Sequence, residues 1–368
     1  MWSRLLVSAL CLCWPLGVRA DILIGQTTGL TGNSAANVKE TGAGARLWLD
    51  AVNKKGGIGG QRIELISLDD KGDTALASQN ARKLIEERKV IALFMVRGTP
   101  QNEAILPLLE QYGIPLIAPS TGAMLLHSPI KKYVFNVRSS YQDEAERAIV
   151  QLASMGVSRI AVLKTQDSFG TDTAQGAERG FASTKLTPAF VASFDKAKPD
   201  FQASVGGILA SNAQAVMVLG TGTAVVKATE EIRKAGSQAT IVTLSNNAST
   251  GFVRDLGKLA RGVVVTQVFP SERALGLPMI REATDLLRAN GGGELSPAMI
   301  EGYAAAKVLV EALRRSGARP TSPSLLAALE GMSNYDLGGV AVHFSSTSHS
   351  GVKFTDLSVV DGTGHFRR

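Results

Sequence analysis

The chain has few of the residues that most catalytic and metal sites use. Only two of its 368 residues are cysteines, Cys11 and Cys13, and both lie in the N-terminal segment discussed below. The rest of the chain therefore has no disulfide, no thiol nucleophile and no cysteine-bound metal. Histidine occurs four times, and three of these residues follow residue 340. Because no His-Glu-x-x-His pattern is present, we expect no metal site.

Signatures of common catalytic and nucleotide-binding loops are also missing. Ser120 is not in a Gly-x-Ser-x-Gly elbow. The stretch "GFVRDLGKL" resembles a phosphate-binding loop, but its glycines are one residue too far apart and Leu259 replaces the required hydroxyl. "GAGARL" lacks the third glycine of a dinucleotide-binding fingerprint. We find no nucleophile with a base, so we predict a protein that is not an enzyme and has no cofactor.

Long hydrophobic runs are absent. No stretch approaches the ~18 apolar residues of a transmembrane helix. Residues 5–18 are mostly apolar but too short to span a bilayer, and they follow a basic start and precede Val18-Arg19-Ala20. This pattern predicts a secretory signal peptide over residues 1–20, cleaved before Asp21. No lipoprotein pattern precedes either cysteine, so we expect a soluble protein exported to the periplasm.

No basic tract suggests a nucleic-acid partner. The formal charge is +7, but lysine and arginine are scattered among acids, as in "EEIRKAG" and "LIEERK". Aromatic residues are not interleaved with these charges. The pattern is typical of a solvated surface of mixed charge, and no nucleic-acid binding is predicted.

Short apolar runs alternate with helical patterns over the first third of the chain. "DILIGQ", "IELISL", "VIALFMV" and "PLIA" have the composition of strands. Between them, Ala45, Trp48, Leu49 and Val52 fall on one helical face, and Asp73 is a plausible N-cap for a helix through residue 87. The order strand–helix–strand predicts an α/β fold with a parallel sheet covered by helices on both faces.

A second series of the same kind follows. "RIAVLK", "AFVASF", "AVMVL", "TIVTL" and "GVVVTQV" are its strands. Two helical segments and the strand-like "VAVHF" and "LSVV" come after Pro270. Such a tail is too short to fold alone and must complete earlier sheets. We therefore expect two tandem α/β units, with the chain crossing between them more than once.

Four strand ends lead into loops rich in hydroxyl, amide and glycine groups. These are "MVRGTP" at 95–100, "APSTGA" at 118–123, "LGTGT" at 219–223 and "LSNN" at 244–247. Backbone N–H groups at such ends form an anion cradle when a helix follows, and hydroxyls add donors without charge. Each loop alone could merely cap its helix. Two loops in each unit favour a binding cleft between the units.

The order of several motifs resembles a known family. "NKKGGIGGQRIELISLDD", "GIPLIAPSTGA", "YVFNVRSSYQDE", "QDSFG" and "GVVVTQV" follow one another as in type I periplasmic solute-binding proteins of the leucine/isoleucine/valine-binding group. The resemblance implies two Rossmann-like lobes joined by three crossovers. Lobe 1 would comprise residues 21–137 and 268–345, and lobe 2 residues 138–267 and 346–368. It further implies that the lobes close on a small-molecule ligand that an ABC permease receives. A monomer is expected.

The resemblance also implies ligand-binding residues. In the amino-acid binders of that family, donors after the third and fourth strands hold the ligand carboxylate, and those positions match Thr99 and Ser120, Thr121 and Gly122. The second lobe adds an aromatic residue, which matches Phe169, and a residue from the loop near Thr221.

The chain departs from the family pattern in its charges. Ser245 stands where the amino-acid binders carry the carboxylate that pairs with the ligand ammonium. Either another acid such as Asp167 or Asp172 replaces it, or the ligand has no ammonium. Arg97, beside Thr99, either is a solvated rim residue or pairs with a ligand carboxylate.

The predicted function is that of a periplasmic substrate-binding component of an ABC importer, for an amino acid or a related small carboxylate. The alternative is a periplasmic ligand-sensing receptor that passes lobe closure to a regulatory partner.

Overall fold

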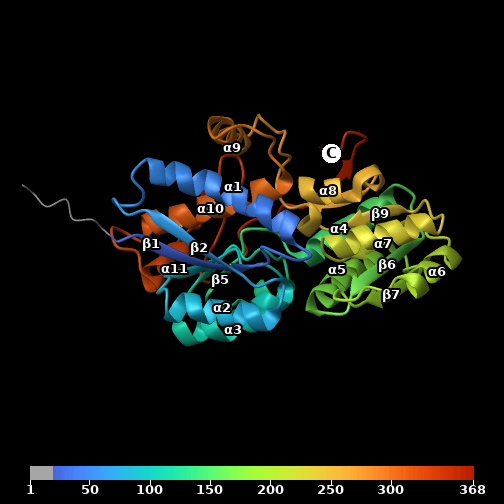
Figure 1. The fold of residues 1–368 in the computed structure, drawn as a ribbon, viewed down its shortest axis with the longest axis horizontal. Helices are drawn as coiled ribbons and strands as arrows, with labels where there is room; N and C mark the ends of the chain where they lie inside the picture. The colour runs from blue at the N-terminus through green and yellow to red at the C-terminus, as the bar shows by residue number, and fades with distance from the viewer. Residues whose placement is uncertain (1–19) are drawn as a thin grey trace, which may run out of the picture.

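The computed structural model describes residues 20–368. The predicted signal peptide therefore lies, apart from Ala20, outside the described residues. Within this range, no helix combines the length and the apolar character that a membrane span requires. The described chain forms two lobes side by side, each built on its own sheet (Figure 1).

The first lobe contains a five-stranded parallel sheet in the order β2-β1-β3-β4-β5. Its strands are β1 (Ile22–Thr28), β2 (Ile63–Asp69), β3 (Ala92–Phe94), β4 (Leu116–Ile117) and β5 (Val134–Phe135). Helices cover both faces, as predicted. The helices α1 (Ala35–Lys54), α10 (Pro297–Arg315) and α11 (Ser322–Glu330) pack on one face, and α2 (Thr74–Glu86) and α3 (Thr99–Tyr112) on the other.

Two glycines let α1 and α10 cross in close contact. A Cβ atom at Gly44 would lie 1.9 Å from the carbonyl oxygen of Met299, and one at Gly302 would lie 1.8 Å from that of Thr41. This crossing fixes the position of α1, whose N-terminus points at the second lobe (Figure 1). Asp73 caps α2 as the sequence predicts, since its side chain accepts from the backbone N–H of Leu76 at 2.7 Å.

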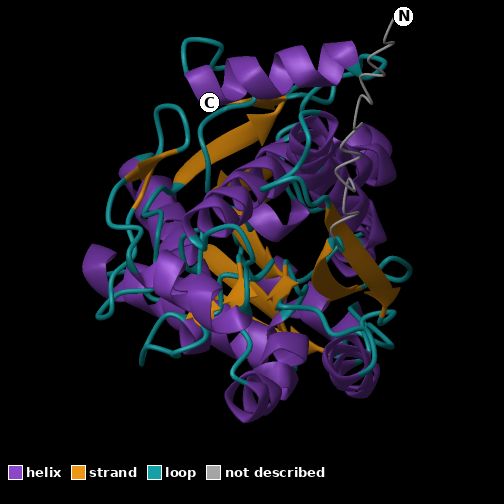
Figure 2. Ribbon diagram, turned by 90° about the vertical axis from the view of Figure 1, so that its left-hand side faces the viewer, coloured by secondary structure: helices purple, strands orange, loops and turns teal. Residues whose placement is uncertain are grey.

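The second lobe contains a seven-stranded sheet in the order β14-β13-β10-β9-β8-β6-β7. Its strands are β6 (Ile160–Thr165), β7 (Phe190–Phe194), β8 (Ala215–Leu219), β9 (Thr240–Thr243), β10 (Val264–Gln267), β13 (Asp356–Val360) and β14 (Phe366–Arg367). Only the last two are antiparallel additions. One face carries α4 (Tyr141–Ser154) and α5 (Ser168–Thr184), and the other carries α6 (Gln202–Ala210), α7 (Thr223–Lys234) and α8 (Thr250–Leu256). Figure 2 shows helices on both sides of the strands.

The chain crosses between the lobes three times. It leaves the first sheet after β5, returns after β10 into α9 (Pro278–Ala289), and enters the second sheet again at β13. The expected α/β architecture of two lobes is thus confirmed. The last crossing lies near residue 355 rather than at the predicted 345, because Val352 is buried in the core of the first lobe.

Several small elements differ from the sequence prediction. The first sheet has a fifth strand, β5, and three helices rather than two follow Pro270. The hairpin of β11 (Tyr335–Asp336) and β12 (Ala341–Val342) forms a separate two-stranded sheet. Strands of two residues leave too short an apolar run to recognise, which explains why β5, β11 and β14 carried no clear pattern.

A buried histidine in the first lobe predicts a pH-dependent stability. Burial, together with the charge of Arg138, lowers the pKa of His127 to about 4. Its Nδ1 lies 2.8 Å from the hydroxyl of Ser350. The unfolded chain therefore binds a proton at this residue between pH 6.5 and 4 that the folded chain does not, so stability falls as pH falls. We expect a loss of about 2 kcal/mol between pH 7 and pH 5 from this residue.

The measurement is urea unfolding of the wild type and His127→Gln at both pH values. The stability of the variant should depend less on pH than that of the wild type. Equal dependence in the two proteins would show that His127 is readily protonated in the folded chain.

Candidate ligand-binding site

A cavity of about 340 Å³ lies between the lobes, and we call it the main cavity. Its walls follow the carboxyl ends of parallel strands in both lobes, where open α/β sheets bind ligands. The first lobe contributes the loops after β1, β2 and β3, and the second lobe the loops after β6, β7 and β8. The residues most relevant to chemistry are Asp70, Lys71, Arg97, Thr99, Tyr141, Asp167, Phe169, Lys196 and Thr221.

Arg97 is a buried cation at the wall of the main cavity. The parallel pairing of β3 and β4 extends by one bridge, Arg97 with Ser120, which brings the two residues together. The guanidinium donates to Asn37 Oδ1 at 2.8 Å, to Ser120 Oγ at 3.3 Å and to the carbonyl oxygen of Asn246 at 3.0 Å. All three acceptors are neutral, although Arg97 is only 5% exposed. Because a buried charge is costly without a counter-charge, the site favours an anion.

The hydroxyl cluster after β4 stands behind the cavity wall. Thr99 lines the cavity, and its hydroxyl lies 2.9 Å from that of Thr121, which is fully buried. The Gly122 carbonyl accepts from the Tyr141 N–H at 2.7 Å, and a Cβ there would lie 2.8 Å from the Ser139 carbonyl oxygen. Thr121 and Gly122 therefore orient Thr99 and the first crossover, and Ser120 orients Arg97. None of the three is among the residues that line the cavity.

An aromatic corner forms the part of the wall contributed by the second lobe. The rings of Tyr141 and Phe169 meet edge to face, with centroids 5.1 Å apart. Phe169 is in the first turn of α5, where Asp167 caps the helix by accepting from the N–H of Gly170 at 3.0 Å. This corner offers an apolar surface opposite the polar loops of the first lobe, a division typical of small-molecule sites.

The remaining charges of the main cavity are compensated or neutralised internally. Burial raises the pKa of Asp167, but hydrogen bonds from Lys196, Thr165 and a backbone N–H outweigh it and lower the pKa. Lys196 Nζ lies 2.8 Å from this carboxylate. Burial raises the pKa of Asp70, which favours its neutral form. Arg97 is therefore the cation in the wall that has no acidic partner within the described chain.

Ser245 lies in a different place from the one predicted. The structure puts it against a carboxylate, since its hydroxyl donates to Glu144 Oε1 and its backbone N–H donates to Glu144 Oε2, both at 3.0 Å. Arg138 also donates to the Ser245 hydroxyl, at 2.6 Å. Ser245 is 2% exposed and is not among the residues that line the main cavity.

The two alternative acids also separate. Asp167 lines the cavity, as described above. Asp172 does not, because its carboxylate accepts from the backbone N–H of Met124 at 3.0 Å and from Gln142 Nε2 at 2.9 Å.

Sequence reasoning missed several residues of the site. Lys196 follows β7 in the charged run "FDKAKPD", which reads as a surface loop, and Tyr141 is the first residue of a helix. Asp70 follows β2 and could have been found, because it stands at a strand end like the other loops. The partnership of Arg138 with Glu144 and Glu301 spans 163 residues and has no local signal.

The lobes contact each other around the main cavity. Thr223 donates to Asn33 Oδ1 at 2.9 Å, and Arg97 of the first lobe reaches Asn246 of the second. Gly222 approaches most closely, since a Cβ atom there would lie 1.7 Å from the Asn33 carbonyl oxygen. The described arrangement is thus a closed one, in which the loop after β1 touches the loop after β8.

Comparison with known proteins agrees with this architecture. The sequence profile of the periplasmic binding protein family matches residues 21–363. The chain belongs to this family. A substrate-binding periplasmic protein from Ralstonia solanacearum has a solved structure with 31% identity and a TM-score of 0.87, and the match covers 94% of this chain and 99% of that one.

Two further relatives are more distant. Leu/Ile/Val-binding protein homolog 3 of Brucella melitensis biotype 1 is 24% identical over 311 residues, which is 84% of this chain and 83% of the relative. A possible leucine/isoleucine/valine-binding protein from Rhodopirellula baltica SH 1 is 23% identical, with a TM-score of 0.89 and coverage of 97% and 98%. At that identity the second likeness shows the fold alone. The resemblance read from the sequence motifs is thereby confirmed.

Proposed function

We propose that this periplasmic binding protein is the substrate-binding component of an ABC importer. Its ligand would be an amino acid or a related small carboxylate, held in the main cavity without chemical change. The observation that carries the proposal is Arg97, a buried cation without an acidic partner in the wall of a cavity between two lobes. The relative named a Leu/Ile/Val-binding protein homolog supports a ligand of this class.

The proposed ligand contacts divide between the lobes. Arg97 and Thr99 of the first lobe supply a charged and a neutral donor for a carboxylate. Phe169 and Tyr141 of the second lobe pack against the apolar part of the ligand, and Thr221 faces the same space. A ligand can shift the open–closed equilibrium only through contacts that it gains in the closed arrangement. The contacts with Phe169, Tyr141 and Thr221 are those contacts, so binding and closure are one process.

Gly222→Ala tests whether closure is needed for binding. The added methyl group would overlap the Asn33 carbonyl of the other lobe, so it penalises the closed arrangement without adding a side chain to the main cavity. We expect ligand affinity to fall at least ~10-fold, which corresponds to ~1.4 kcal/mol against closure. Calorimetric titration with a ligand found by thermal-shift screening measures this.

Gly236→Ala is the matched control. Gly236 is in the same lobe and also has a positive φ, but nothing lies within 4 Å of an added Cβ. This variant bears the same kind of backbone strain without obstructing the lobes, so its affinity should stay close to that of the wild type. If both variants bind as the wild type does, closure as described here is not coupled to binding, and the proposed mechanism is wrong.

A further inference from the structure

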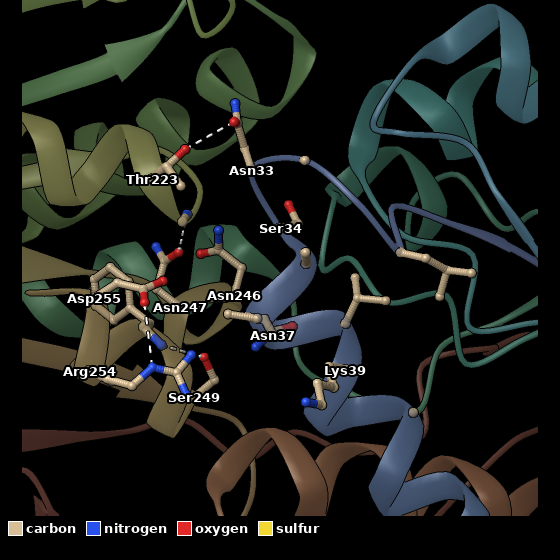
Figure 3. A pocket seen from close by; sticks show the side chains of 18 of the residues that line it. Asn33, Ser34, Asn37, Lys39, Thr223, Asn246, Asn247, Ser249, Arg254 and Asp255 are labelled. Carbon is tan, nitrogen blue, oxygen red and sulfur yellow. Dashed lines mark hydrogen bonds and ion pairs between the residues drawn. The ribbon is translucent and has the colours of Figure 1, made fainter.

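A second hollow between the lobes lies beside the main cavity and belongs to none of the contacts described so far. It measures about 480 Å³ (Figure 3). The first lobe contributes the start of α1, with Asn37, Lys39 and Arg46, and the second lobe contributes Asn246 and Arg254. We call it the side groove. The loop of residues 32–34 borders both the side groove and the main cavity, so the two spaces are neighbours.

Two buried amide groups of the side groove each have one unused polar atom. Asn37 Nδ2 and Asn246 Oδ1 are buried and have no hydrogen-bond partner among the described residues. The other atom of each amide is occupied, because Asn37 Oδ1 accepts from Arg97 and Asn246 Nδ2 donates to the carbonyl of Gly220 at 3.0 Å. These bonds fix the orientation of both amides. The side chains are 4% and 1% exposed.

The two unused atoms are complementary, since one is a donor and the other an acceptor, and they come from different lobes. Figure 3 shows Asn37 on α1 and Asn246 on the facing segment of the second lobe. Leaving a buried polar atom without a partner costs about 1–3 kcal/mol. A molecule that accepts from Asn37 and donates to Asn246 would remove both costs. A carboxamide or a hydroxyl group can do so.

The charge of the side groove is positive. Lys39, Arg46 and Arg254 line it against a single carboxylate, Asp255, which is 3.8 Å from Arg254. The N-terminus of α1 adds to this charge, because Ser34 makes no side-chain capping bond and the first turn contains no acid.

A second acid nearby does not offset these charges. Glu40, on the same helix, directs its carboxylate at the backbone N–H groups of Thr250 and Gly251, at 3.0 Å and 2.8 Å. An anion would therefore be favoured in the groove.

We propose that the side groove is a second ligand site, for a small organic anion that carries a carboxamide or hydroxyl group beside its carboxylate. Its polar group pairs with Asn37 and Asn246, and its carboxylate lies among Lys39, Arg46 and Arg254. Because both lobes line the groove, this ligand also favours the closed arrangement and raises the affinity of the main cavity for its own ligand.

Succinamate, which has one carboxylate and one primary amide, is a suitable probe. Titration into the chain from Asp21 onward, followed by ¹⁵N–¹H spectra, should shift the side-chain amide signals of Asn37 and Asn246. The affinity from calorimetry should fall at least ~10-fold in the double variant Lys39→Ala/Arg254→Ala, as expected for lost charged contacts. The control Lys258→Ala/Arg261→Ala removes the same two charges from exposed positions outside the groove lining and should bind as the wild type does.

A third variant separates the two sites. Phe169→Ala changes the main cavity alone, so it should leave succinamate binding unchanged. The proposal is overturned if succinamate binds no variant and no wild type, if the groove double variant binds as tightly as its control, or if only Phe169→Ala loses binding. The last result would place the probe in the main cavity.

Discussion

Replacing Arg138 with methionine is expected to destabilise the folded chain by about 3–5 kcal/mol at pH 7. Arg138 is at the first crossover between the lobes and is 2% exposed. Its guanidinium forms ion pairs with Glu144 on α4 and, at 3.2 Å, with Glu301 on α10. Burial alone would lower the pKa of Arg138, but the two carboxylates raise it above its ordinary value. The cation therefore holds together one helix of each lobe.

Without Arg138, two carboxylates would remain buried without a counter-charge. Their pKa values would rise in the folded state, so the folded variant would bind more protons than the unfolded one. The stability deficit of Arg138→Met should accordingly shrink as pH falls from 7 to 5. Urea unfolding at the two pH values measures both effects.

Arg179→Met is the matched control for this prediction. Arg179 also pairs with two acids, Asp143 and Glu146, and also joins α4 to α5, but its side chain is 43% exposed. Exposed ion pairs contribute ~0–1 kcal/mol, so this variant should lose little stability. If Arg138→Met is no less stable than Arg179→Met, the buried network contributes no more than a surface pair.

Arg97→Met is expected to reduce the affinity for a carboxylate ligand at least ~30-fold, because truncating one partner of a buried charge pair costs about 2–5 kcal/mol. Arg97 has only neutral acceptors around it, so the ligand would be its counter-charge. Arg97→Lys keeps the charge but loses the planar fork, and should bind with intermediate affinity. Calorimetry with one carboxylate ligand compares the three proteins.

Lys196→Met provides the contrast. Lys196 is also a cation of the main cavity, but Asp167 already pairs with it at 2.8 Å. Its loss should therefore affect the ligand less than the loss of Arg97. Equal loss of affinity in the two variants would show that total charge, and not the unpaired state of Arg97, determines binding.

The charges of the site also bear on the ligand ammonium. The acid nearest Ser245 is Glu144, and Arg138 already neutralises it. Asp167 is paired with Lys196. No carboxylate of the main cavity within residues 20–368 is thus both ionised and free to pair with an ammonium, which favours a carboxylate without one. Introducing glutamate at Ser245 would place a further carboxylate against Glu144, so that substitution is not expected to create an ammonium site.

The fold could be predicted from the sequence because its long strands and amphipathic helices carry clear periodicity. "IELISL" and "RIAVLK" fall within β2 and β6 with small shifts at their ends. The two-residue strands β5 and β14 could not be predicted, since so few residues show no alternation. The last crossover was misplaced because Val352 is buried by contacts with distant residues that no local pattern announces.

The site could be predicted only as far as strand ends reveal it. Arg97, Thr99, Phe169 and Thr221 all follow strands, and the structure brings all four to the main cavity. Strand ends also present residues that support the wall from behind, and Thr121 and Ser245 are of this kind. Telling a wall from its support requires the direction of each side chain, which depends on long-range packing.

The central claim is that the main cavity holds a small carboxylate between closed lobes, and a set of paired melting curves tests it most directly. The chain from Asp21 onward would be heated with leucine, phenylalanine and glutamate, and with the 2-keto acid of each. A ligand present at ~100 times its dissociation constant stabilises the fold by ~2.7 kcal/mol, which shifts the melting temperature visibly. The account predicts a shift with at least one keto acid that is larger than the shift with its amino acid. A shift with an amino acid and none with its keto acid would contradict it, and so would the absence of a shift with all six compounds.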